Sequence, residues 1–76
     1  MHRKEQIAAA FAEEVGAVVR NQREHVGLRQ DELALAAGVS ARVVHQIEHG
    51  KPTSRIDSVL AVLDGLGLTL EVSRRA

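Results

Sequence analysis

The sequence predicts an all-α fold that ends in a short β-strand: a bundle of four to five helices that contains a helix-turn-helix. Three observations predict this fold class. Apolar residues recur three and four positions apart through most of the chain, which is helical spacing. The run AGVS at residues 37–40 separates two of these helical segments. The period changes to two over residues 68–72, where apolar and polar residues alternate as in a half-buried strand.

The first helix is expected over residues 5–24, with Gly27 as its C-terminal cap. Its predicted apolar stripe has members four, four and three positions apart: Ile7, Phe11, Val15 and Val18. We divide the chain into a loosely packed N-terminal helical extension (residues 1–14), a helix-turn-helix domain (residues 15–67), and a C-terminal dimerisation strand with its tail (residues 68–76).

Two short helices, expected over residues 30–37 and 41–48, are joined by a turn that is typical of a helix-turn-helix. Gly38 can adopt the positive φ that ends a helix. Val39 can fill the apolar corner, and Ser40 can cap the next helix by accepting a hydrogen bond from a backbone N–H. Such a motif exposes the front of its second helix, in a geometry that suits the major groove of DNA.

The fourth helix is expected to open at Ser54, because Asp57 three residues later completes a capping-box pattern. It should continue to Gly65 or Gly67. The strand that follows has no sequence-adjacent partner, and a lone strand leaves its backbone groups unpaired. We therefore expect it to pair antiparallel with the same strand of a second copy, across a two-fold axis. A short fifth helix or a disordered end is the alternative. The residues expected to mediate dimerisation are Leu68, Leu70 and Val72.

The amino-acid composition limits the classes of function that the chain can have. The chain has 76 residues, enough for one small domain. It contains no cysteine, which excludes disulfides and thiolate metal sites and fits a reducing compartment. Neither a secretory signal nor a membrane span is apparent. We expect a cytoplasmic protein that associates with the nucleoid by binding DNA.

Charge distribution favours duplex DNA as the partner. The formal net charge is +0, which argues against indiscriminate nucleic-acid binding. Between residues 38 and 55, however, the cations Arg42, Lys51 and Arg55 outnumber the single anion, Glu48. A locally positive face can hold phosphates in a neutral protein. The single aromatic residue provides no stacking platform for single strands or RNA loops.

From about residue 15 to residue 72, the chain resembles the phage-repressor-like (Cro/C1-type, XRE) helix-turn-helix family, whose fold is the lambda-repressor-like bundle. The resemblance rests on the segments GLRQ at 27–30, ELA at 32–34, AGVS at 37–40 and IEHGKPT at 47–53. Residues 56–68, followed by a strand, resemble the narrower branch of HipB-type antitoxins. That branch represses its own operon and binds a HipA-like toxin with a serine/threonine-kinase fold.

The resemblance also implies roles for individual residues. The residues that would read base edges are Ser40, Ala41, Arg42 and His45, and those that would contact phosphates are Arg29, Gln30, Gln46, Lys51, Thr53 and Ser54. Arg23 and Glu48 would form a structural ion pair between the first and third helices, which keeps Glu48 away from DNA. Two positions depart from the family pattern: Arg29 stands where many relatives have a capping Ser or Thr, and His49 replaces the commoner Asn.

These observations lead to a homodimeric repressor that reads a palindromic operator, with an antitoxin of a HipBA-like system as the alternative. A remote alternative is a metal-dependent hydrolase, because residues 45–49 match H-x-x-E-H with His45, Glu48 and His49. A catalytic zinc needs a third protein ligand and a substrate cleft, and the chain is short for such an enzyme. We therefore expect no metal, no cofactor and no enzymatic activity.

Overall fold

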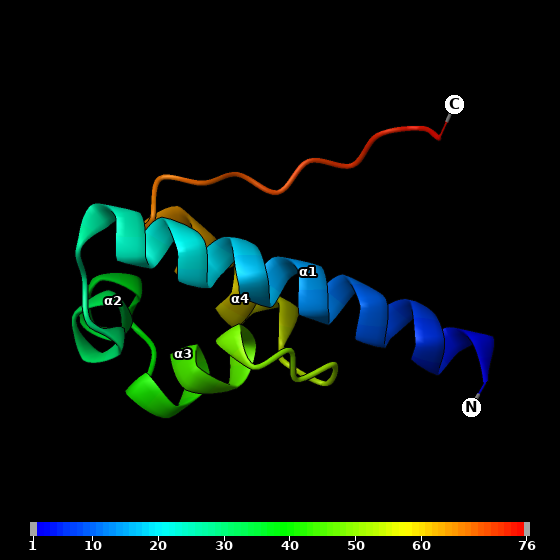
Figure 1. Ribbon diagram of the computed structural model, residues 1–76, viewed down its shortest axis with the longest axis horizontal. Coiled ribbons are helices and arrows are strands. Elements are labelled where there is room, and N and C mark those ends of the chain that lie inside the picture. The colour runs from blue at the N-terminus through cyan, green and yellow to red at the C-terminus, as the bar shows by residue number, and fades with distance from the viewer. Residues whose placement is uncertain (1, 76) are drawn as a thin grey trace.

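The computed structural model describes residues 2–75, which form four helices. These are α1 (Arg3–Val26), α2 (Gln30–Ala37), α3 (Ala41–Glu48) and α4 (Ile56–Gly65). Helix α3 packs against α1, and α2 packs against α3 and α4. The three short helices lie beside the C-terminal half of α1, and its N-terminal turns project beyond them (Figure 1). None of these helices is long and apolar enough to cross a membrane. The predicted helix-turn-helix bundle is confirmed, and the described residues form four of the four to five helices expected.

Small aliphatic side chains from all four helices form the core. Its buried members are Val19, Leu33, Ala34, Val44, Ile47, Val59, Val62, Leu63 and Leu66. The stripe predicted for the first helix is wrong in part, because Ile7, Phe11 and Val18 are exposed whereas Val19 is fully buried. Two causes account for the difference. The first turns of α1 lie beyond the other helices, and the buried face of α1 is set by Gly16, at its crossing with α3.

The predicted helix ends agree well with the structure around the turn. Gly27 ends α1 with φ 87°, and Gly38 ends α2 with φ 73°. Ser40 caps α3, since its hydroxyl oxygen accepts a hydrogen bond of 3.2 Å from the backbone N–H of Val43. Val39 is partly buried against the core, as expected for the apolar corner. The first helix is longer than predicted at both ends.

The capping box predicted for the fourth helix is wrong. The helix begins at Ile56, with Arg55 at the capping position. The Ser54 hydroxyl instead donates to the carbonyl of Lys51, 3.0 Å away, within the turn that follows α3. The Asp57 carboxylate accepts the N–H of its neighbour Ser58 at 2.8 Å. Ser54 therefore closes the preceding loop and does not open the helix.

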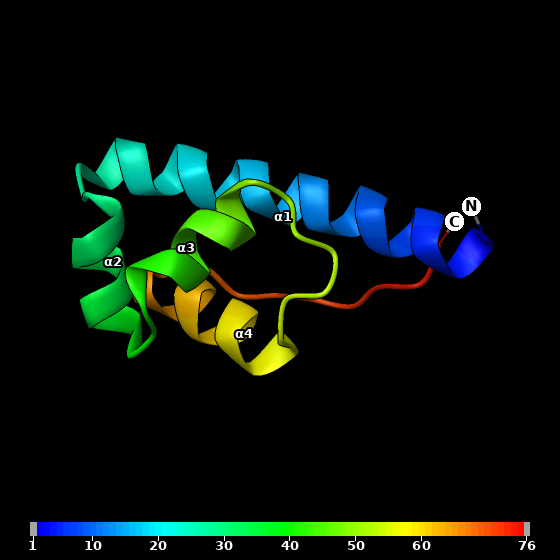
Figure 2. The ribbon, with the colours of Figure 1, turned by 90° about the horizontal axis from the view of Figure 1, so that it is seen from below.

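Residues 68–75 run back alongside α1 in an extended path without forming a strand or a fifth helix (Figure 2). Leu68 and Leu70 are half-buried against the core, whereas Val72 is 97% exposed. The strand predicted over residues 68–72 is thus not formed within this single chain. A strand is defined by hydrogen bonds to a neighbouring strand, and helices α1 and α4 use their backbone groups internally, so neither can supply that ladder.

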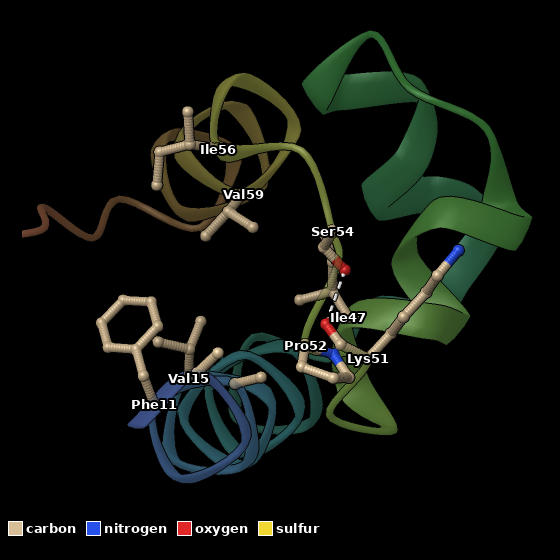
Figure 3. Close-up of a pocket in the computed structure, with 10 residues that line it drawn as sticks. Phe11, Val15, Ile47, Lys51, Pro52, Ser54, Ile56 and Val59 are labelled. Atoms are coloured by element: carbon tan, nitrogen blue, oxygen red, sulfur yellow. Dashed lines mark hydrogen bonds between the residues drawn. The ribbon is translucent and has the colours of Figure 1, made fainter. Parts of the chain in front are cut away.

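An apolar groove lies between α1 and α4 (Figure 3). Phe11 and Val15 project into it from α1, and Ile56 and Val59 project from α4. Ile47 and the loop at Pro52 close one side. The groove lies between residues 8–15 of α1 and the first turn of α4.

Helices α1 and α3 cross at Gly16. A Cβ atom at this position would lie 2.5 Å from the carbonyl oxygen of Ile47 and 3.0 Å from that of Glu48. Only glycine allows the two backbones this close approach, and the approach places the end of α3 directly on α1.

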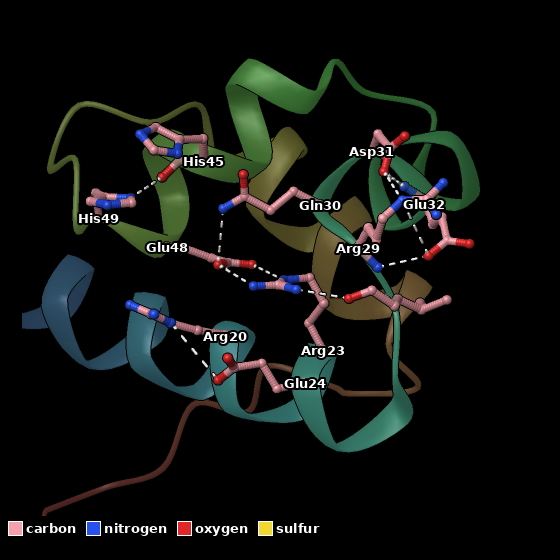
Figure 4. A network of polar contacts seen from close by, with 11 residues as sticks. Arg20, Arg23, Glu24, Arg29, Gln30, Asp31, Glu32, His45, Glu48 and His49 are labelled. Carbon is pink, nitrogen blue, oxygen red and sulfur yellow. Dashed lines mark hydrogen bonds and ion pairs between the residues drawn. The ribbon is translucent and has the colours of Figure 1, made fainter.

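A two-point ion pair holds the same end of α3 (Figure 4). Arg23 on α1 donates from Nε to Oε2 of Glu48 at 2.5 Å and from Nη2 to Oε1 at 3.0 Å. Its Nη1 also donates to the carbonyl of Leu28 at 2.7 Å, and Gln30 donates to Oε1 of Glu48 at 3.2 Å. The Glu48 side chain is 1% exposed. The structure therefore brings Arg23 and Glu48 together in a network that joins three helices.

Burial alone would raise the pKa of Glu48. Hydrogen bonds from Arg23 and Gln30, with the charges of Arg23 and Arg20, outweigh burial and hold this pKa below its ordinary value. The pKa of Arg23 is raised, chiefly by its hydrogen bond to Glu48. Both partners are therefore charged at neutral pH.

The substitution Gly16→Ala tests the crossing of α1 and α3. Alanine in a helix interior normally stabilises by about 0.5–1 kcal/mol relative to glycine. At this position we expect a loss of about 1–3 kcal/mol in the free energy of unfolding, because the methyl group must separate two backbones. Gly65→Ala is the matched control, since a Cβ there meets its nearest atom at 3.4 Å. Urea denaturation measures both variants, and an equally stable Gly16→Ala protein would contradict the close crossing.

The ion pair predicts a specific dependence of stability on pH. The pKa of Glu48 is lower in the folded state than in the unfolded state. Its contribution to the free energy of unfolding is therefore fully present above its unfolded pKa of about 4.3, and it is lost as pH falls through its folded pKa. Glu48→Gln leaves the largely buried Arg23 without its counter-charge, so we expect the free energy of unfolding to fall by about 3 kcal/mol at pH 7.

The loss caused by Glu48→Gln should shrink as pH is lowered toward 3, because wild type then loses the same charge. Asp57→Asn provides the control, since Asp57 pairs with Arg55 on the protein surface and should contribute much less to stability. Denaturation of the three proteins from pH 7 to pH 3 measures the effect. A constant difference between wild type and Glu48→Gln over that range would contradict this account.

Candidate nucleic-acid interface

Helix α3 has one face in the core and one face in solvent. Val44 and Ile47 are buried, whereas Arg42 and His45 are exposed on the other side of the helix. Ser40 and Ala41 at the start of α3 are exposed as well. The structure thus places all four residues predicted to read bases on one exposed front. The Ser40 hydroxyl keeps its hydrogen free to donate, because its oxygen is the atom that caps α3.

Four of the six residues predicted to contact phosphates line one shallow hollow beside this front. These are Gln46, Lys51, Thr53 and Ser54. The Nζ of Lys51 lies 3.5 Å from Oε1 of Gln46, which draws the end of α3 and the following loop together. Val43, Arg55 and Ser58 complete the hollow.

Sequence reasoning did not identify Ser58 as a member of this hollow. Ser58 belongs to the first turn of α4, and its place in the hollow depends on how α4 packs beside α3, which the sequence does not show. Arg55 holds Asp57 at two points, at 3.1 and 2.9 Å, so its charge is partly offset.

The other two predicted phosphate contacts are separate from this hollow and engage protein groups (Figure 4). The Nε of Arg29 donates to the Asp31 carboxylate at 3.1 Å, and its backbone N–H donates to Glu32 at 2.8 Å. Gln30 directs its amide nitrogen to Glu48. Glu32 thus provides the reciprocal half of a capping box, and the backbone N–H of Glu32, which a Ser or Thr at position 29 would accept, is accepted by the Asp31 carboxylate at 3.0 Å.

Electrostatics make the front of α3 positive although the whole chain is neutral. Arg42 and Lys51 are exposed cations, and His45 and His49 lie on the same helix end. Glu48 is the one carboxylate in α3, and it is buried against Arg23. Among the described residues of α3, no acidic side chain therefore reaches the solvent to repel a phosphate.

The H-x-x-E-H pattern does not assemble as a metal site. His45 and His49 stack with ring centroids 4.0 Å apart, and Nδ1 of His49 donates to the carbonyl of His45 at 2.8 Å. Glu48 instead turns into the protein and accepts hydrogen bonds from Arg23 and Gln30. Within residues 2–75, no three potential ligands of the His, Cys, Asp and Glu types gather at one point. The geometry therefore gives no support to the hydrolase alternative.

Comparison with known proteins agrees with this geometry. A family described as a helix-turn-helix domain matches residues 14–76 of the chain. An uncharacterized HTH-type transcriptional regulator of Sinorhizobium fredii, y4mF, is 48% identical over 59 residues, which are 78% of either chain. The turn at Gly38, the cap at Ser40 and the exposed front of α3 are the features of such a domain. The chain belongs to the helix-turn-helix family of the phage-repressor-like (XRE) type.

Proposed function

We propose that this protein is a sequence-specific regulator of transcription that reads duplex DNA with α3. The observation that carries the proposal is the joint exposure of the α3 front and the adjoining hollow of potential phosphate contacts. The name of its relative as an HTH-type transcriptional regulator supports the same function. A helix with phosphate contacts beside it can be held in register in the major groove while its front reads base edges.

Arg42 is the strongest candidate for base reading, because its planar guanidinium can donate two hydrogen bonds to guanine. His45 lies nearly one turn further along the helix, within reach of a base edge or a phosphate. Ala41 can contact a thymine methyl group, and Ser40 can donate from its hydroxyl. Lys51 then neutralises backbone phosphates from the neighbouring loop.

Arg29 and Gln30 have a different part in this proposal. Their side chains are engaged with Asp31 and Glu48, so a phosphate at the start of α2 would compete with these partners. The unbonded backbone N–H groups of the first turn of α2 are available there to support such a contact.

The protein is proposed to act as a homodimeric repressor on a palindromic operator, in the cytoplasm and at the nucleoid. Two copies of α3 would read two half-sites related by symmetry. Support comes from the tail, which has an extended backbone and whose apolar residues Leu68, Leu70 and Val72 alternate with polar residues along the sequence. The antitoxin alternative, with a HipA-like kinase toxin as partner, shares this DNA face. No surface of the described residues favours it, so we propose the regulator alone.

Arg42→Ala should separate base reading from phosphate binding. We expect affinity for a duplex that the protein selects from a random pool to fall by about 10- to 100-fold, as for loss of a two-point contact to guanine. Binding to a scrambled duplex should fall much less. Lys51→Ala is the contrasting variant, which should weaken binding to both duplexes alike and reduce the salt dependence.

Fluorescence anisotropy on the two duplexes gives these affinities. The stoichiometry of the complex, from the same titration, should be two chains per selected duplex. An equal loss on both duplexes for Arg42→Ala would contradict its role as a base reader. A stoichiometry of one chain per duplex would contradict the proposed dimer.

A further inference from the structure

The first turns of α1 are an addition to the family domain. The family match begins at residue 14, whereas α1 already begins at Arg3. These turns project beyond the other helices (Figure 1) and carry Ile7 and Phe11, which are 55% and 44% exposed. Large apolar residues on a projecting helix face cannot be explained by the core of the single chain.

Phe11 and Val15 join two neighbouring grooves into one apolar strip, and Ile7 lies one helical turn before Phe11 on α1. Phe11 and Val15 line the groove between α1 and α4, shown in Figure 3, and they also line a second groove under the tail. Leu68 and Leu70 form part of that second groove. Ile56 and Leu60 on α4 are exposed as well. A continuous apolar strip of this kind marks an interaction surface.

We propose that the first turns of α1 form part of a homodimer interface, in which Ile7 and Phe11 pack against a second copy of this chain. This inference rests on the dimer of the proposed function and adds a second contact region to its tail. The directions of two segments indicate that a second copy of this chain covers these turns. The tail beyond Leu70 and the projecting turns of α1 extend the same way from the bundle in both views (Figures 1 and 2).

The register of the tails places the second copy. Side chains opposite one another in an antiparallel pair share a face, so only registers that match apolar with apolar positions are favourable. A two-fold axis at Leu70 gives each of the three apolar tail residues an apolar partner. Leu70 then lies opposite Leu70 of the second copy, and Leu68 lies opposite its Val72. Each tail beyond Leu70 then lies over the other copy, which covers the exposed Val72. The projecting turns of α1 extend the same way, so they too reach the second copy.

Charge complementarity favours a second copy over an unrelated partner. In this register, Arg74 lies opposite Leu66 of the second copy, next to the C-terminal end of its α4. That end carries the exposed Asp64 and the negative pole of the helix dipole. The basic tail and the acidic helix end are thus complementary surfaces of one sequence. Helix α3 lies on the opposite side of the bundle from the tail (Figure 1), so the dimer leaves the DNA face open.

The three isoleucines of the chain provide a direct test. Protein carrying ¹³C-labelled isoleucine methyl groups is mixed with unlabelled protein, and NOEs between the two kinds of chain are recorded. We expect such NOEs at the methyl groups of Ile7. Ile47 is the internal control, because it is buried in the core and should give none. A dimer that shows no NOE between chains at Ile7 would overturn the inference.

Sedimentation equilibrium supplies an independent measurement on the full chain. Ile7→Glu should raise the dimer dissociation constant at least tenfold while leaving the helix content unchanged. Leu35→Glu is the matched control, since Leu35 is an exposed apolar residue of α2 outside the strip, and its dissociation constant should match wild type. An unchanged constant for Ile7→Glu overturns this inference and leaves the proposed function intact. A wild type that stays monomeric on operator DNA would overturn the proposed dimer as well.

Discussion

The contact between α1 and the end of α3 is the constraint on which the rest of the structure depends. Gly16 lets the two backbones meet, and the Arg23–Glu48 pair fixes their relative orientation. The core consists of small aliphatic side chains, which specify shape but provide little directionality. A buried, hydrogen-bonded ion pair supplies that directionality. The exposed front of α3 therefore points outward in one defined direction, as the proposed reading of DNA requires.

The same pair explains how a chain without net charge can present a positive face. Glu48 lies on α3, the helix proposed to read DNA, but its charge is neutralised inside the protein by Arg23. Arg42 and Lys51 remain in solvent nearby. The stabilising network and the electrostatics of the candidate interface thus have a common origin. A change at Glu48 would affect both the orientation of α3 and the potential that a phosphate meets.

Features decided by neighbouring residues were predictable, and features decided by distant contacts were not. Gly38 and Ser40 act through their own backbone and cap, so the turn was predicted correctly. Gly16 was missed, because its role depends on Ile47 far along the chain. Gln30 was assigned to phosphate without knowledge that Glu48 lies beside it. The strand over residues 68–72 could not form here, because its proposed partner is another molecule.

We expect α3, held by the close contact at Gly16 and by the Arg23–Glu48 pair, to read a specific duplex sequence. The most direct test is fluorescence anisotropy of wild-type protein on the duplex upstream of its own gene and on a scrambled duplex, at two salt concentrations. We expect a preference of about a thousandfold or more for the upstream duplex, dependent on a palindrome within it, that persists at the higher salt. Weak binding to both duplexes that disappears with added salt would contradict sequence-specific reading by α3.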